Sequence, residues 1–152
     1  MRLGTGELAA ASVFLVAAQF LVVPRLTQPQ DRMALWSALI PLLFVLVSAG
    51  VYWLLARAWV ERELMPRGVA ATYRVLRVAS VLILAGGLAG LIVWWPNNIA
   101  VALSVAGVWA FAAAEFTNYF IVRLAYPVTR WFAAVAQWRT PQLVADMHNA
   151  GD

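Results

Sequence analysis

The side chain with the greatest chemical potential in this sequence is Glu115, which lies within a long apolar stretch. Asn118 and Tyr119 follow it at i+3 and i+4, so the three share one face of a helix. A charged carboxylate in hydrocarbon costs at least about 2.5–3.5 kcal/mol unless it is paired, protonated or exposed to water. This face could therefore carry a proton, bind a ligand or hold an ion pair.

A partner for Glu115 is expected on the preceding apolar segment. Only Pro96 and Asn97 separate the two segments, which favours a tight antiparallel hairpin. The register of that hairpin puts Arg77 close to the depth of Glu115, with Arg74 one turn nearer the end of the bundle. The predicted intramembrane polar cluster consists of Glu115, Asn118, Tyr119, Arg77 and Arg74.

This cluster has two interpretations. The first is an ion pair between Glu115 and Arg77 that fixes helix register. The second is a site that carries a proton or holds an anionic ligand, because ionisable groups at membrane depth often serve function. One carboxylate without a second acid or a histidine is weak evidence for catalysis, so no catalytic residue is predicted.

Cysteine is absent and His148 is the one histidine. Disulfides, thiol catalysis, covalent haem, iron–sulfur clusters and zinc sites all need ligands that this chain lacks. The sequence therefore predicts no metal and no cofactor.

The composition favours lipid as the solvent. Of 152 residues, 64% are hydrophobic and 12% are charged, against about 25% charged in soluble proteins. A bilayer core needs about 20 helical residues, and four segments meet that requirement, at about 6–23, 33–57, 70–95 and 98–124. We expect an all-α fold: a polytopic membrane four-helix bundle over residues 1–126, with Asn98 capping the last span.

The arginines predict the orientation. There is no lysine, and the net charge is +4. Two arginines, Arg25 and Arg32, fall on one side of the predicted membrane. The other nine fall on the side of both termini: Arg2, Arg57, Arg62, Arg67, Arg74, Arg77, Arg123, Arg130 and Arg139. Positive residues concentrate on the cytoplasmic side, so both termini are predicted to be cytoplasmic, in the inner membrane of a cell. These arginines suit lipid headgroups, and no nucleic-acid partner is predicted.

Aromatic residues fall near the predicted boundaries and are expected to anchor the spans, although a ligand platform is an alternative. The outer group is Trp36, Trp94 and Trp95, and the inner group is Tyr52, Trp53, Trp59, Tyr73, Tyr126 and Trp131.

Residues 127–152 are expected to form an amphipathic cytoplasmic interfacial tail. Trp131, Phe132, Val135 and Trp138 follow helical spacing. Thr140-Pro141 predicts a short second helix through about Met147. The tail would anchor the chain on the lipid surface or dock a protein partner.

Small residues predict where helices approach closely. Gly86 and Gly90 are expected to face Ala106, Ala110 and Ala114 within the hairpin, and homodimerisation through the two glycines is the alternative. Pro41 is expected to kink the second span, with Ser37 taking up a freed backbone group.

The segment Glu115-x-x-Asn118-Tyr119-Phe120-x-x-Arg123-Leu124 and the tail sequence at 138–143 resemble uncharacterised small bacterial four-helix inner-membrane proteins. The resemblance covers the last third of the chain and implies a topology without implying a reaction.

Three functions follow from these patterns. The first is a non-enzymatic accessory or interaction subunit of a membrane complex. The second is a small oligomeric transporter or channel with a proton-carrying carboxylate. The third is an enzyme acting on lipid or quinone. The predicted partners are membrane lipids, with a protein partner or a second copy of the chain as further candidates.

Overall fold

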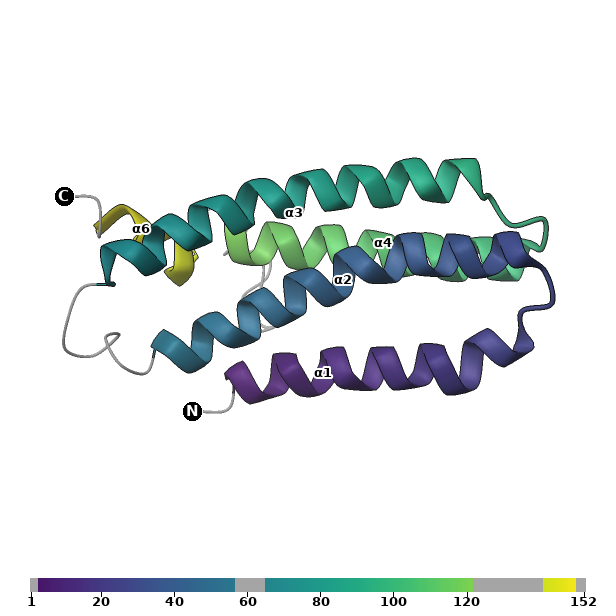
Figure 1. Ribbon diagram of the computed structural model, residues 1–152, viewed down its shortest axis with the longest axis horizontal. Coiled ribbons are helices and arrows are strands. Elements are labelled where there is room, and N and C mark those ends of the chain that lie inside the picture. Colours follow the sequence, from purple (N-terminus) through teal and green to yellow (C-terminus); the bar gives the residue numbers. More distant parts are fainter. Residues whose placement is uncertain (1–2, 57–64, 122–140, 150–152) are drawn as a thin grey trace, which may run out of the picture.

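The structure, a computed structural model, describes residues 3–56, 65–121 and 141–149. This part of the chain is helical and contains no strand (Figure 1). Its helices are α1 (Leu3–Ala17), α2 (Pro29–Ala56), α3 (Arg67–Val93), α4 (Ile99–Phe120) and the short α6 (Gln142–Asn149). The predicted all-α four-helix bundle is confirmed.

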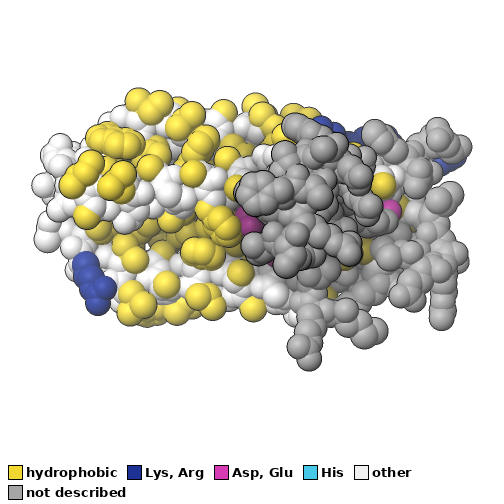
Figure 2. Space-filling model, turned by 180° about the vertical axis from the view of Figure 1, so that it is seen from behind, with side chains coloured by type: hydrophobic (Ala, Val, Ile, Leu, Met, Phe, Trp, Pro, Cys, Tyr) yellow, Lys and Arg dark blue, Asp and Glu magenta, His cyan; other side chains and the backbone are white. Residues whose placement is uncertain are grey.

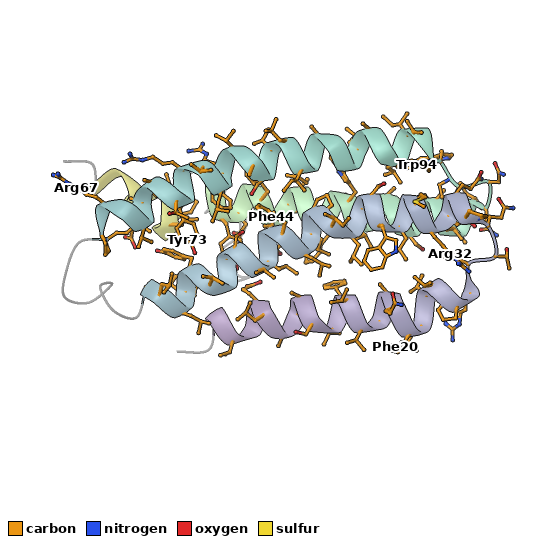
Figure 3. All side chains as sticks on the ribbon, viewed as in Figure 1. Phe20, Arg32, Phe44, Arg67, Tyr73 and Trp94 are labelled. Carbon is orange, nitrogen blue, oxygen red and sulfur yellow. The ribbon has the colours of Figure 1, made fainter. Side chains whose placement is uncertain are left out.

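Four of these segments are long and apolar enough to cross a membrane: Thr5–Arg25, Pro29–Ala56, Arg67–Val93 and Ile99–Phe120. Hydrophobic side chains cover the long sides of the bundle on the face that Figure 2 shows, and arginines appear towards its ends. Phe20 points away from the bundle (Figure 3) and is 71% exposed, as a side chain in contact with lipid would be. The chain is an integral, multi-pass membrane protein.

Prolines and caps set the helix ends. Pro24 has no N–H to donate and its ring crowds the preceding turn, and α1 there widens into a π-helical turn, Ala18–Val22, before a 3-10 turn, Val23–Arg25. Pro29 opens α2, where a missing N–H costs nothing. The side chain of Asn98 accepts hydrogen bonds from the N–H groups of Ala100 and Val101, at 2.9 and 3.3 Å. The predicted cap of α4 is confirmed.

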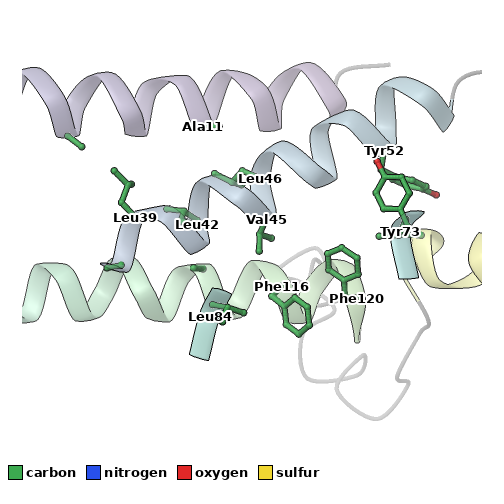
Figure 4. Close-up of a cluster of buried hydrophobic side chains, with 14 of the residues drawn as sticks. Ala11, Leu39, Leu42, Val45, Leu46, Tyr52, Tyr73, Leu84, Phe116 and Phe120 are labelled. Atoms are coloured by element: carbon green, nitrogen blue, oxygen red, sulfur yellow. The ribbon is translucent and has the colours of Figure 1, made fainter. Parts of the chain in front are cut away.

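Helix α2 is the centre of the bundle, and α1, α3 and α4 all pack against it. Its buried residues Leu39, Leu42, Val45 and Leu46 fill the space between α1 and α4 (Figure 4). Helices α3 and α4 contact each other less extensively than each contacts α2. The predicted hairpin of α3 and α4 is present, but both helices use their larger contact surfaces on α2.

The glycines of α3 serve this contact with α2. A Cβ on Gly87 would stand 2.5 Å from the Ser37 carbonyl oxygen and 2.6 Å from Cγ of Pro41, while one on Gly90 would stand 2.4 Å from Oγ of Ser37. Gly86 has no neighbour within 4 Å at the same position. Gly87 and Gly90 of α3 therefore allow the close approach to α2. The expectation that Gly86 and Gly90 face α4 is wrong, because Gly90 faces α2 and Gly86 has no neighbour within 4 Å.

The alanine row on α4 also departs from its expected role. Ala102 is buried and Ala106 is half-buried, whereas Ala110 and Ala114 are exposed. A step of four residues advances the helix by slightly more than one turn, so such a row drifts by about 40° per step. The row therefore leaves the packed face before it reaches Ala114.

Pro41 lies inside α2 and is buried against α3. It frees the carbonyl of Ser37, four residues earlier. The Ser37 hydroxyl donates instead to Met33 O, at 2.8 Å. Gly87 rather than the Ser37 side chain therefore covers the freed group.

The bundle has two distinct ends, the tail end and the hairpin end. The tail end holds the start of α1, the end of α2, the start of α3, the end of α4, and α6. The hairpin end holds the turns at residues 26–28 and 94–98.

Candidate functional site

A polar contact near the tail end joins the first and the last of the four long helices. The Tyr119 hydroxyl, in the last turn of α4, donates to Oε1 of Glu7 in α1 at 2.5 Å. The two residues are 112 positions apart in sequence, and both are half-buried. The contact fixes the rotation of α4 relative to α1.

Glu115 lies one turn before Tyr119 on the same face of α4 and is half-buried. The bond from Tyr119 to Glu7 brings Glu7 to within about one helical turn of Glu115, so two carboxyl groups from different helices lie near each other. We call Glu7 and Glu115 the acid pair, and the acid pair with Tyr119 the acid site. Asn118, on the same helix face, is half-buried and also has an interaction partner.

An aromatic contact also joins α1 and α4. The rings of Phe14 and Phe111 lie 6.0 Å apart and meet at 38°. Both helices pack mainly against α2. The acid site and this ring contact are therefore two side-chain contacts between α1 and α4.

The structure brings Glu7, and not Arg77, beside Glu115. Arg77 is exposed on α3, and no ion pair joins it to Glu115 within the described residues. The predicted alignment of α3 with α4 along the bundle axis agrees with the structure, since Trp109 Nε1 of α4 donates to Leu84 O of α3 at 3.0 Å. The helix face was the error, because Tyr119 and Glu115 are directed to α1.

Arg74 has a different role from the one predicted. It donates from a terminal guanidinium nitrogen (Nη2) to Met147 O of α6 at 3.1 Å. The structure thus separates Arg74 from the acid site and connects it to the tail.

A second polar network ties α6 to the bundle. Tyr52 of α2 donates to Oδ2 of Asp146 at 2.8 Å, and both residues are buried. The rings of Tyr52 and Tyr73 meet edge to face at 5.7 Å, and the Tyr73 hydroxyl donates to Ser48 O at 3.2 Å. We call Tyr52, Tyr73 and Asp146 the tyrosine–tail network.

Two predicted lipid anchors are therefore core residues. Tyr52 is 1% exposed and Tyr73 is 2% exposed, and Tyr73 points into the bundle in Figure 3. Trp94 and Trp95, at the hairpin end, are exposed as expected of boundary anchors. Trp59, Tyr126 and Trp131 lie outside the described residues.

The tail prediction is met in part. Helix α6 begins directly after Pro141, close to the predicted start, and the Pro141 carbonyl accepts from Val144 and Ala145 N–H. It packs on α3 and α4 instead of presenting its apolar residues to lipid. The stripe Trp131, Phe132, Val135 and Trp138 lies outside the described residues.

Sequence reasoning missed Glu7. The available signal was an acidic residue within the first apolar span, where any ionisable group is a candidate for function. The network of Tyr52 with Asp146 had no such signal, because two residues far apart in sequence carry no mark of their contact.

The chemistry available at the acid site is proton transfer at oxygen atoms. Across residues 3–56, 65–121 and 141–149, no group of three or more His, Cys, Asp or Glu could hold a metal ion. The site offers carboxyl and phenol groups, which accept and donate protons.

The fold and the acid site define a polytopic membrane four-helix bundle with an intramembrane acid pair. Comparisons with protein families, curated proteins and solved structures give no match to this chain. The resemblance of its last third to small bacterial inner-membrane proteins stays a prediction.

Proposed function

We propose that the protein binds and releases a proton at the acid pair, as part of a small, oligomeric transporter or channel. The observation that supports this proposal is the hydrogen bond from Tyr119 to Glu7, which brings a second carboxyl group from another helix to within about one helical turn of Glu115. Two neighbouring carboxylates away from bulk water repel each other, so binding a proton at this location relieves that repulsion. An ion pair with Arg77 would instead have favoured a purely structural role.

The proposed orientation places the acid site in the cytoplasmic half of the membrane. Its support is the distribution of arginines, since the sequence predicts nine on the side of the two termini and two on the other side. Among the described arginines, Arg67 and Arg74 lie at the tail end, and Arg25 lies at the hairpin end. The proton would then exchange with the cytoplasm, which is the nearer aqueous phase.

The experiment uses the full chain in liposomes that contain a pH-sensitive dye. A potassium diffusion potential drives proton entry, and the dye reports the rate. We expect a flux above that of empty liposomes, which Glu115→Gln and Glu7→Gln each reduce at least tenfold. Asp31→Asn, an acid-to-amide change at the hairpin end, is the matched control and should retain the flux.

Infrared spectroscopy gives an independent readout of the same site. A protonated carboxyl band should appear as the pH is lowered, and it should be lost in both glutamine variants. Flux equal to that of empty liposomes, or flux unaffected by both variants, would contradict the proposal.

The second candidate is an accessory subunit of a membrane complex. The first span, Thr5–Arg25, favours an accessory subunit, because only 11% of its most apolar stretch of 18 residues is buried inside the molecule. Another membrane protein could cover this face, and lipid could do so equally. Purification in a mild detergent distinguishes a protein cover from a lipid cover. Co-purification of a stoichiometric partner protein supports the role as an accessory subunit, and a chain that purifies alone contradicts that role.

A further inference from the structure

Helix α6 depends on the bundle for its structure. It has only 8 residues, and helices this short are unstable alone in water. Leu143, Val144 and Met147 are buried, at 1%, 7% and 3% exposed, against α3 and α4. The helix is therefore stable only while it is docked.

Hydrogen bonds to α2 and α3 hold the docked helix. The buried bond from Tyr52 to Asp146 joins it to α2, and the bond from Arg74 to the Met147 carbonyl joins it to α3. The second places a cation near the C-terminal end of α6, where the helix dipole favours positive charge. The interface of an 8-residue helix is small compared with the rest of the bundle, so it opens more easily than the whole bundle unfolds.

The docking site of α6 includes part of α4 at the tail end. Helix α6 contacts α4, and the last turn of α4 contains Tyr119 of the acid site next to the fully buried Phe120. A docked α6 therefore restrains the turn that holds the hydrogen bond to Glu7.

We propose that α6 is a latch that controls proton exchange at the acid pair. When α6 is docked, the last turn of α4 is held against the bundle and exchange is slow. When α6 is released, that turn can move away from α1 and the acid pair opens to the aqueous phase. This regulation rests on the proposed function, whereas the opening of α6 does not.

The chain has no cysteine, so a single introduced thiol reports the latch. Leu143→Cys places the thiol in the docked interface, and Arg67→Cys, at an exposed position of α3, is the control. Both full-length variants are reconstituted in lipid nanodiscs and treated with a water-soluble maleimide. We expect Leu143→Cys to react much more slowly than Arg67→Cys.

Weakening the latch should speed the reaction. Tyr52→Phe keeps the ring and removes the hydroxyl, and we expect it to raise the labelling rate of Leu143→Cys about ten- to a hundredfold, as for loss of a hydrogen bond to a charged group. Arg74→Gln is the second weakening variant and serves if Tyr52→Phe fails to fold. Arg74 is exposed, and its replacement should also raise the labelling rate of Leu143→Cys. The rate of Arg67→Cys should not change.

The outcomes separate the two proposals. Equal labelling of Leu143→Cys and Arg67→Cys in the parent chain, or rates unaffected by both weakening variants, would overturn the latch. Faster labelling with an unchanged proton flux in liposomes would overturn its control of the acid pair. A parent chain that moves no protons overturns the proposed function and this regulation, while the labelling rates still decide whether α6 opens. Faster labelling together with a raised flux supports both.

Discussion

The Tyr119 hydroxyl donates a side-chain hydrogen bond that joins α4 to α1 through Glu7. A hydrogen bond in a poorly hydrated setting contributes more when its acceptor is ionisable, because an unpaired carboxyl oxygen loses its solvation. The bond between Tyr119 and Glu7 therefore contributes to the position of α1 relative to α4.

Tyr119→Phe should lower the free energy of unfolding by about 1–3 kcal/mol, because it leaves Glu7 without its donor. Titration with sodium dodecyl sulfate in mixed micelles, followed by circular dichroism, measures this change. In the background of Glu7→Ala the same substitution should cost much less, because the bond is already absent. Equal costs in both backgrounds would show that the bond does not stabilise the bundle.

Arg77→Gln should change the free energy of unfolding by less than about 0.5 kcal/mol, as is usual for an exposed position, because Arg77 makes no ion pair with any residue that the structure describes. The sequence-based ion pair with Glu115 requires a larger loss, which Glu115→Gln would partly cancel in the double variant. The same micelle titration of the single and double variants discriminates between the two.

At the scale of helices, the contact between α2 and α3 shows how proline and glycine act together. Pro41 leaves the Ser37 carbonyl without its helical donor, and Gly87 lies directly against that carbonyl. Contacts of a glycine Cα–H with a carbonyl recur where helices pack closely. Any larger residue at position 87 would separate the helices at this point.

Gly87→Ala should destabilise the bundle by about 1–3 kcal/mol, because the new methyl group meets backbone and a proline ring that cannot move aside. Gly86→Ala, one residue earlier, is the matched control. Its methyl group meets nothing within 4 Å, so it should be neutral or stabilise by up to about 1 kcal/mol through helix propensity. Unfolding of both variants in mixed micelles gives the comparison, and the reverse order would place α3 on its other face.

Asn98→Ala should cost about 1 kcal/mol, because the N–H groups of Ala100 and Val101 lose their acceptor. Asn98→Asp keeps an acceptor and should retain most of the stability. Asn97→Ala, at the exposed neighbouring position, is the control for a change in the turn itself. A similar cost at both positions would argue against the cap.

Hydropathy and proline predicted the four long helices and the cap at Asn98, because a membrane demands long apolar helices and each end must satisfy its own backbone. The faces were harder to predict. Membrane helices are apolar all round, so periodicity does not distinguish the side towards lipid from the side towards the core. Gly86 and Gly87 illustrate this, since adjacent residues of one type have opposite environments. The predicted partner of Glu115, Arg77, was wrong for the same reason.

For the whole molecule, the arginine distribution and the two ends of the bundle give a directional prediction. Arg67 at the tail end and Arg25 at the hairpin end are both exposed. With an impermeant maleimide on intact cells, Arg25→Cys should react from outside, and Arg67→Cys should react only after permeabilisation. The opposite pattern would invert the proposed orientation and place the acid site towards the outside.

The central place of α2 has a consequence for biogenesis. Helices enter the membrane from the N-terminus onwards during synthesis, so α1 and α2 arrive before either α3 or α4. During that interval the Ser37 carbonyl freed by Pro41 faces lipid without Gly87 beside it, and the apolar core face of α2 has only α1 as a neighbour. The nascent pair is thus incomplete until the second half of the chain is inserted. A chain interrupted after α2 should therefore be a substrate for membrane quality-control proteases.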